Sequence, residues 1–430
     1  MSSEVIVLPL EECLDALIDY RGKTPVKTDS GIPLITAKII KGGRIKTPTE
    51  FIAKDEYLTW MRRGIPKEGD VVLTVEAPLG EVAQLGPEKI ALAQRVVTLR
   101  GKAGLLDSTY LLYLLQTEEM QAQLKSRATG TTVLGIKQSE LRKVTLTLPS
   151  IHLQLSAAAT LKALDDRITL LRESNATLEA IAQALFKSWF GDFDPVRAKM
   201  EGRIPEGMDE DTAQLFPDEL EESEFGLVPT GWQVGKLGAI LKLRNERVQP
   251  SEYTMSLPYV PIENISAKVP FLQEFKSGAE ANSSLTLFRK GDVLFGAMRP
   301  YFHKVCAAPF DGVTRTTVFT LRPVNSSASA FALFQAYQDS TIDYATQHSE
   351  GSTIPYAKWK NSMELMPLLL PSDSVQTAFS AVVSSFVERA NLNVLQAQAL
   401  STLRDTLLPR LISGQLRLPE AEAQIEAIAA

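Results

Sequence analysis

The chain has 430 residues, a formal net charge of −6, 44% hydrophobic residues and 22% charged residues, which is typical of a globular protein with two or more domains. No run approaches the roughly 18 apolar residues of a membrane helix. Met1-Ser2-Ser3-Glu4 has no basic region before an apolar stretch, so we expect a cytoplasmic protein without an export signal. The two cysteines, Cys13 and Cys306, argue against a disulfide framework and fit a reducing compartment.

The acidity is concentrated in two segments. Residues 201–224 contain ten acidic side chains and one Arg, and residues 419–430 contribute a charge of −3. The rest of the chain therefore carries a charge of +6. This mild excess is weak support for a nucleic-acid partner, because affinity for DNA follows local clusters of Lys and Arg and not the global sum.

In chain order, residues 1–150 predict a mixed α/β domain. Asp70–Val75 and Arg95–Leu99 are β-rich runs, and a helix is expected over residues 109–126.

Residues 151–190 predict one long helix, the central half of a spacer. Its apolar residues recur at spacings of three and four over about four heptads, which favours a coiled-coil seam. The seam contains Leu161, Leu164, Ile168, Leu171, Leu178, Leu185 and Trp189. Asn175 interrupts it, and a buried Asn fixes register at some cost in stability. The alternative is a helix that covers only its own domain, although the seam is longer than that requires.

Residues 191–225 predict an acidic linker, because Pro195, Pro205 and Pro217 forbid a long helix. Residues 226–371 repeat the mixed α/β plan, with a strand over Thr316–Leu321 and a helix over residues 328–345. Residues 372–430 supply a second spacer helix, over 376–412, and a tail. The second seam contains Val383, Phe386, Leu400, Leu407 and Leu411, with Asn393 as its polar member.

The two halves repeat each other at a nearly constant offset in residue number. Lys67–Leu73 returns as Arg289–Phe295, and Gly130-Thr131-Thr132 returns as Gly351-Ser352-Thr353. This is a duplication of whole domains. The predicted fold class is therefore α+β, with two pseudo-repeated mixed α/β domains joined by a two-helix antiparallel coiled-coil spacer. We expect the helices to be antiparallel because domains at opposite ends of one spacer, related by pseudo-twofold symmetry, have helices that run oppositely.

Motifs for catalysis are mostly missing. The chain has no Gly-rich phosphate loop, no Asn/Asp-Pro-Pro-aromatic quartet for adenine methylation, and no His spacing typical of a metal site. Pro217-Asp218 is too far from Glu274-Phe275-Lys276 to indicate a nuclease. Gly69-Asp70 and Gly291-Asp292 are better explained as turns that enter strands than as catalytic residues. We expect no catalytic residue, no metal and no cofactor on this chain, with an enzyme of unrecognised site as a further alternative.

Basic, amide, hydroxyl and aromatic residues gather at turns in both halves and predict DNA contact. In the first half they are Lys38, Lys41, Arg44, Arg62, Arg63, Arg95, Thr131, Thr132 and Lys137. In the second half they are Arg244, Arg247, Asn264, Arg299, Tyr301, His303, Lys304, Arg315, Ser352, Thr353, Tyr356, Lys358 and Lys360. Gly42-Gly43 is expected to let the backbone approach a phosphate. For any single Lys or Arg, the alternative is a solvated surface charge.

Three segments carry a resemblance to a known family. Leu185–Val196 resembles the central region of the specificity subunits of Type I restriction-modification systems. Leu215–Trp232 resembles that family's entry into its second target-recognition domain, and Leu407–Leu416 resembles its C-terminal helix end. The first domain lacks the Pro-x-Gly-Trp entry of Pro229–Trp232, so its N-terminal strand is expected to start differently.

The resemblance implies a non-catalytic subunit that binds double-stranded DNA. Each globule would recognise half of a bipartite target, and the two helices would set the gap between the halves. Two modification subunits would supply S-adenosylmethionine-dependent methyl transfer, and restriction subunits would use ATP and Mg for translocation and cleavage. The alternative is a duplicated DNA-binding scaffold protein that serves another partner set.

Overall fold

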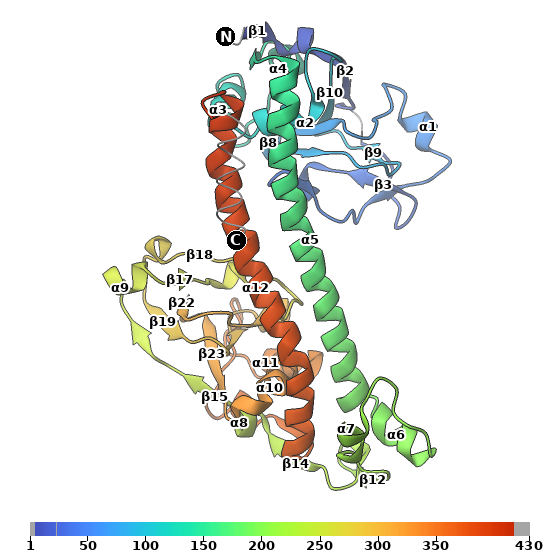
Figure 1. Cartoon of the computed structure of the whole chain (residues 1–430), viewed down its shortest axis with the longest axis vertical. Helices are drawn as coiled ribbons and strands as arrows, with labels where there is room; N and C mark the ends of the chain where they lie inside the picture. The colour runs from blue at the N-terminus through green and yellow to red at the C-terminus, as the bar shows by residue number, and fades with distance from the viewer. Residues whose placement is uncertain (1–4, 23, 417–430) are drawn as a thin grey trace. The chain divides into compact units, whose positions relative to one another are not determined.

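The computed structural model describes residues 5–22 and 24–416. They divide into two compact units. Unit 1 comprises the described residues up to Arg167 together with those from Ala399 onward, and unit 2 comprises Ile168–Gln398. In each unit a globule of strands and short helices packs beside segments of the same two long helices, α5 (Ile151–Phe190) and α12 (Asp373–Ile412) (Figure 1). No helix in the described part of the chain is long and apolar enough to span a membrane.

Unit 1 is built on a four-stranded antiparallel sheet with the order β2-β10-β7-β8. Its strands are β1 (Ile6–Pro9), β2 (Leu14–Asp19), β3 (Ile32–Ile35), β4 (Ile40–Lys41), β5 (Arg44–Ile45), β6 (Phe51–Ile52), β7 (Val71–Val75), β8 (Leu79–Gln84), β9 (Ala91–Leu92), β10 (Val96–Gly101) and β11 (Thr145–Leu148). Its short helices are α1 (Tyr57–Trp60), α2 (Ser108–Leu114), α3 (Glu118–Ser126) and α4 (Gln138–Leu141). The strand β7 is buried along its whole length, which explains its unbroken apolar sequence.

Unit 2 repeats this sheet with the order β15-β23-β20-β21, and it has a five-stranded sheet, β16-β19-β22-β17-β18, where unit 1 has the three-stranded sheet β6-β3-β9. Its strands are β12 (Leu220–Ser223), β13 (Gly226–Pro229), β14 (Gln233–Lys236), β15 (Leu241–Arg244), β16 (Arg247–Val248), β17 (Pro258–Tyr259), β18 (Lys276–Ser277), β19 (Leu285–Phe288), β20 (Val293–Gly296), β21 (Val305–Ala307), β22 (Gly312–Arg315), β23 (Val318–Pro323) and β24 (Pro367–Leu370). Its short α-helices are α6 (Asp194–Met200), α7 (Glu210–Gln214), α8 (Leu237–Ile240), α9 (Glu252–Met255), α10 (Ser329–Tyr337) and α11 (Asp339–Gln347).

The duplication extends to single hydrogen bonds. The carboxylate of Asp70 pairs with the guanidinium of Arg100 at 2.8 Å and accepts from the Lys67 N–H. At the equivalent positions of unit 2, Asp292 pairs with Arg322 at 2.6 and 2.7 Å and accepts from the Arg289 N–H. Both aspartates are almost fully buried, so the Gly-Asp motifs are turns held by a buried ion pair, as the sequence indicated.

One prediction was wrong in the same way in both units. The expected single helices over 109–126 and 328–345 are each two helices. The Thr117 side chain caps α3 by accepting from the Met120 N–H, which ends α2 before it. In unit 2 the extended backbone of Gln338 separates α10 from α11. Thr117 followed by two glutamates is a local signal for a helix start that the prediction of one helix overlooked, whereas Gln338 makes no side-chain cap.

The first domain opens with the same strand as the second. β1 pairs with β11 so that Ile6 lies opposite Leu148, and β14 pairs with β24 so that Gln233 lies opposite Leu370. The expectation of a different start was therefore wrong. The difference lies in the residue before the strand, which is Val5 in unit 1 and Trp232 in unit 2.

The two long helices are antiparallel within each unit. In unit 2, the Asn393 amide donates to the Asn175 side-chain oxygen at 2.8 Å, and the rings of Phe186 and Phe379 are 5.6 Å apart. In unit 1, Arg404 pairs with Asp165 at 2.6 Å. Each helix has 40 residues, which gives about 60 Å at 1.5 Å per residue. The α+β class with an antiparallel helix pair is confirmed.

The structure places the predicted seam residues inward. Leu161, Leu164, Ile168, Leu171, Trp189, Val383, Leu400, Leu407 and Leu411 are buried. Leu178, Leu185 and Phe386 are partly buried against the core of unit 2. Phe216 from the linker is buried against Trp189, with ring centres 5.2 Å apart, so part of the acidic linker is ordered by an aromatic anchor.

Candidate nucleic-acid interface

The same two loops meet at one end of the four-stranded sheet in each unit. In unit 1 they are residues 76–78, between β7 and β8, and residues 130–134. Thr129 and Gly135 close the second loop through two backbone hydrogen bonds of 2.9 Å, and Ile136 N donates to Val75 O at 3.0 Å. The residues Gly130-Thr131-Thr132 at the tip are exposed. We call this pair the loop pair of unit 1.

The loop pair of unit 2 is residues 298–303 and 351–355. Glu350 and Tyr356 close the second loop through backbone hydrogen bonds of 3.0 and 2.8 Å, and Ala357 N donates to Ala297 O at 2.8 Å. Gly351, Ser352 and Thr353 are exposed at the tip. The two units thus present exposed hydroxyl groups on equivalent loops, a residue type that suits phosphate and base contact.

In both units, the first loop of the pair contains a residue with left-handed backbone that is followed by proline. Ala77 has φ 49° and Arg299, at the equivalent position, has φ 52°. Positive φ is uncommon outside Gly, and it persists only where the surrounding structure holds the backbone in place. Arg299 N donates to Pro355 O at 2.7 Å, which fixes the two loops of unit 2 together. The Nε of Arg299 is buried without a hydrogen-bond partner, so this guanidinium has unused donor capacity.

Further cationic and phenolic groups surround the loop pair of unit 2. The Arg315 Nε is also buried without a partner, and its Nη2 donates to the Asn282 side chain at 3.3 Å. The Tyr356 hydroxyl donates to Thr316 O at 2.6 Å. Burial raises the pKa of Tyr356, and the neighbouring Arg247 lowers it by a smaller amount. The tyrosine therefore stays protonated near neutral pH and keeps its donor.

In unit 1 the structure adds a residue that the sequence prediction missed. Arg21 pairs with Asp19 and donates through Nη1 to Ile136 O at 2.6 Å, beside the loop pair. The predicted Arg63 donates to the carbonyl groups of Asp19 and Arg21 at 3.0 and 2.9 Å. Arg95 is exposed, and its carbonyl group accepts from Val75 N at 3.0 Å. Lys137 is exposed beside the loop.

A clue to Arg21 was present in the chain. The register of β2 and β15 against their neighbours aligns Leu17 with Leu243. The first strands of the two units are therefore further apart in the sequence than the rest of the repeat, and Arg21 corresponds to Arg247. Arg247 donates to Asn245 at 3.2 Å, as Arg21 does to Asp19. A single offset applied to the whole repeat hides this match.

Several predicted residues lie away from the loop pair of unit 1. Lys38 and Lys41 are exposed beside the turn between β4 and β5. Gly42 N donates to the Glu81 carboxylate at 2.8 Å. This amide is therefore already bonded, contrary to the expectation that it is available to a phosphate. Arg44 reaches toward helix α5, where its Nη2 is 4.0 Å from the Asp165 carboxylate. Arg62 is exposed and lines a separate cavity with Tyr20 and Trp60.

In the turn that follows Arg299 in unit 2, one predicted side chain points to solvent and another points into the protein. Tyr301 is 49% exposed. His303 is only 4% exposed, with Nε2 2.7 Å from Tyr337 O and Nδ1 3.2 Å from the Asp339 carboxylate. Burial lowers the pKa of His303, against smaller opposing effects of the Tyr337 carbonyl group and Asp339. Its predicted contact with DNA is corrected to a structural role, because the ring is turned into the protein.

The remaining predicted residues of unit 2 have partners or lie apart. Lys304 donates to Ile262 O at 2.7 Å, Arg244 pairs with Glu246 at 2.5 Å, and Lys358 pairs with Glu350 at 2.5 Å. Asn264 ends a short 3₁₀ turn, and Lys360 is exposed. The best supported cations of unit 2 are thus Arg247, Arg299 and Arg315.

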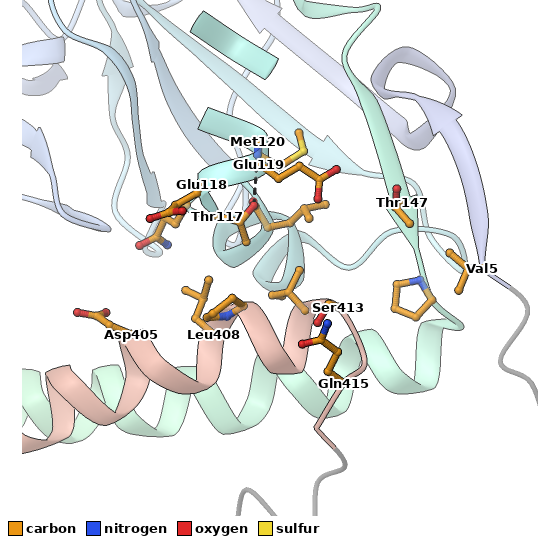
Figure 2. Close-up of a pocket in the computed structure, with 15 residues that line it drawn as sticks. Val5, Thr117, Glu118, Glu119, Met120, Thr147, Asp405, Leu408, Ser413 and Gln415 are labelled. Atoms are coloured by element: carbon orange, nitrogen blue, oxygen red, sulfur yellow. Dashed lines mark hydrogen bonds between the residues drawn. The ribbon is translucent and has the colours of Figure 1, made fainter. Parts of the chain in front are cut away.

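A cavity of about 730 Å³ in unit 1 is unsuited to nucleic acid. Figure 2 shows it between the end of α12 and the start of α3, with Asp405 on one side and Glu118 and Glu119 on the other. The residues described around it include no Lys or Arg, so a phosphate would meet only negative charge. Within residues 5–22 and 24–416, no group of three or more His, Cys, Asp or Glu side chains could hold a metal ion.

The chain is similar to known proteins of one kind. Residues 16–180 match the family model described as the Type I restriction modification DNA specificity domain. The MjaIX specificity subunit of Methanocaldococcus jannaschii is 27% identical over 83% of this chain and 80% of its own length. The HindI specificity subunit of Haemophilus influenzae is 24% identical over 76% of this chain and 82% of its own length. Both are described as specificity subunits of Type I restriction enzymes.

The fold agrees with a solved relative. A crystal structure of a Type I restriction-modification system S subunit from M. genitalium superposes with a TM-score of 0.58, at 17% identity, over 95% of this chain and 96% of that one. The resemblance seen in the sequence is therefore confirmed: over most of its length the chain is similar to specificity subunits of Type I restriction-modification systems, which are non-catalytic components of their complexes.

Proposed function

We propose that this chain binds double-stranded DNA and determines the target of a Type I restriction-modification complex. Unit 1 reads one half of a bipartite target through its loop pair with Arg21, Arg63 and Arg95. Unit 2 reads the other half through its own loop pair with Arg247, Arg299 and Arg315. Guanidinium groups suit this task because they pair with guanine edges through two hydrogen bonds and also neutralise phosphates.

One observation carries the proposal. The two units share the loop scaffold, with equivalent hydrogen bonds and an equivalent left-handed residue before proline, yet the side chain at that residue is Ala77 in unit 1 and Arg299 in unit 2. A shared scaffold with different side chains is what two readers of different sequences require, since backbone contacts position a protein and side chains specify bases.

The partners follow from the family. We propose that two modification subunits, which methylate adenine with S-adenosylmethionine, and restriction subunits, which use ATP and Mg, assemble with this chain in the cytoplasm. The cofactors are assigned to the partner subunits because the family resemblance implies it.

A domain exchange tests the proposal. Residues 226–371 are replaced by the corresponding domain of another specificity subunit, and the methylated motif of the host is sequenced with and without the chimaera. One half of the motif should change and the other should stay. The matched control exchanges residues 1–150 and should change the opposite half. If either exchange alters both halves, the units do not read DNA separately.

A further inference from the structure

The acidic cavity of unit 1 has a floor of apolar side chains. Leu114, Met120, Leu408 and Ile412 are buried at its base, and Val5 closes one end. Thr117 and Glu118 at the start of α3 face Asp405 and Leu408 of α12 across it (Figure 2). Beyond Val5, the strand β1 carries Ile6 and Val7, which are 46% and 62% exposed.

At the equivalent place in unit 2, three aromatic side chains pack against one another. By the offset that relates Asp70 to Asp292, Ile412 corresponds to Phe190 and Gln415 to Phe193. The strand register makes Val5 the counterpart of Trp232. The Phe190 and Phe193 rings lie 6.0 and 5.6 Å from the Trp232 ring. The cavity of unit 1 therefore exists because three large rings are replaced by Val, Ile and Gln.

The residues that follow the aromatic cluster in unit 2 show what kind of segment suits this place. After Phe193, helix α6 buries Val196 and Ala198 and carries Arg197 and Lys199. The Lys199 ammonium group donates to the Phe216 carbonyl group. A large apolar anchor followed by a short basic helix thus completes the core of unit 2 from within the chain.

The rim of the cavity in unit 1 is acidic, because Glu118, Glu119 and Asp405 line it. The structure records no ion pair for Glu118 or Glu119 with the residues it describes. Among the described residues, Asp405 forms an ion pair with its neighbour Arg404 alone, at 2.7 Å. Residues 417–430 contain three Glu and one Arg, so their net charge has the same sign as that of the rim.

We propose that this cavity is a docking groove for a segment of a partner protein that carries an aromatic or large aliphatic anchor followed by Lys or Arg. The anchor fills the space left by Val5, Ile412 and Gln415, and the basic residues pair with Glu118 and Glu119. Insertion of one amphipathic segment into an apolar groove is a common mode of recognition between proteins. The proposal does not depend on DNA binding by this chain.

A pair of labelled peptides tests the proposal on the full-length chain. Both carry residues 189–200 of this protein, which include the aromatic anchors. The basic peptide has Asp192→Lys and Asp194→Lys, and its acidic twin has Arg197→Glu and Lys199→Glu. Binding is followed by fluorescence anisotropy. The basic peptide should bind saturably and the acidic twin at least about tenfold more weakly, because two carboxylates at the rim attract one and repel the other.

Two variants of the chain assign the site. Ile412→Phe with Gln415→Phe introduces the rings found in unit 2 and should abolish peptide binding without lowering Tm. Glu118→Lys with Glu119→Lys should reverse the preference between the peptides. Affinity for DNA, measured in parallel, should be unchanged in both variants, so a failure of DNA binding would leave this test readable.

Three results would overturn the proposal. The first is equal binding of the two peptides, and the second is undiminished binding to the variant with the filled cavity. The third is binding that appears only in a chain that ends at Leu416, because the groove would then be occupied by the chain's own C-terminal residues.

Discussion

Arg299 of unit 2 is equivalent to Ala77 of unit 1. At this loop position unit 1 has no side-chain donor, whereas unit 2 has a guanidinium group. Its backbone is fixed by the bond from its N–H to Pro355 O, and its Nε has no partner. Arg299→Ala should therefore weaken binding to the specific target by roughly 1–3 kcal/mol and relax the sequence preference at one base pair. Binding is measured on the methylated motif and on a scrambled duplex.

The same measurement separates base contact from phosphate contact. A residue that touches only phosphate lowers affinity equally on both duplexes and reduces the salt slope by about one. Lys236→Ala is the control, because Lys236 is an exposed cation of unit 2 that is not among the predicted DNA contacts. If the Arg299 variant binds both duplexes with unchanged affinity, Arg299 does not contact DNA.

Glu179 on α5 is expected to make the stability of unit 2 depend on pH. Burial raises the pKa of Glu179 to about 7, and a hydrogen bond from Gln183 opposes the shift. Because the folded pKa lies above the ordinary value of 4.5, the folded state binds more protons between pH 4.5 and 7. Stability from this group is therefore present at low pH and lost as pH rises through that window.

Glu179→Gln removes the ionisation and should remove the loss. The free energy of unfolding at pH 8 should rise by about 1–2 kcal/mol, a figure reduced to allow for the partial exposure of the side chain. At pH 5 the free energy of unfolding should be almost unchanged. Thermal denaturation at the two pH values provides the measurement. An equal gain at both would show that charge on Glu179 is not the cause.

Residue roles were the part of the site least accessible from sequence. Arg299 and His303 lie four residues apart in one basic-aromatic turn, yet one has an unused donor and the other is buried against Tyr337 O. Both have positive φ, and backbone direction of that kind follows from tertiary hydrogen bonds that no local pattern encodes. Arg21 was missed because the first strands of the two units have a different offset from the rest.

At the scale of elements, the turn before each central strand depends on one buried ion pair. Asp70 and Asp292 are 2% and 1% exposed, and each also accepts from a backbone N–H. Arg100→Met should therefore destabilise unit 1, and Arg322→Met should destabilise unit 2, by about 3 kcal/mol each, because a buried carboxylate loses its counter-ion. Hydrogen exchange should show each loss in the unit that carries the change. Adding Asp70→Asn to Arg100→Met should recover part of the loss, and no recovery would argue against an unpaired charge as its cause.

The helix seam was predictable because a heptad pattern is local in sequence, whereas the partner of its polar residue was not. The sequence indicated one Asn in each helix, and the structure brings the two together: Asn393 donates to Asn175, which donates to Ala390 O at 3.1 Å. Asn393→Ala leaves the Asn175 oxygen buried without this donor and should cost roughly 1–3 kcal/mol.

The double variant Asn175→Leu with Asn393→Leu tests whether the pair fixes register. Replacing both partners by apolar groups is often nearly neutral for stability, so Tm should stay close to that of the unaltered chain. The register of α5 against α12 should become less well defined. Disulfide trapping between cysteines introduced on the two helices within unit 2 measures this register. A single trapped register in the double variant would show that the apolar seam is sufficient.

At the scale of the whole molecule, the length of the paired helices is the property most directly linked to the proposed bipartite target. Antiparallel pairing means that Leu171 of α5 and Gln396 of α12 lie at the same level, since Asn175 meets Asn393. Four residues inserted after each of these positions lengthen both helices by ~6 Å, or roughly two base pairs at ~3.4 Å each. The helices turn by about 40° beyond one full turn, and two base pairs turn the duplex by roughly 70°, so the rotational mismatch is small.

If the helix pair sets the gap between half-sites, the host that carries the double insertion should methylate a motif with both half-sites unchanged and a gap about two base pairs longer. Methylome sequencing reads both properties in one experiment. The control carries four substitutions at the same positions without added length and should retain the original gap. An active double insertion with the original gap would refute the role of the helices as a ruler, because the lengthened pair would then have no effect on where the second half-site is read.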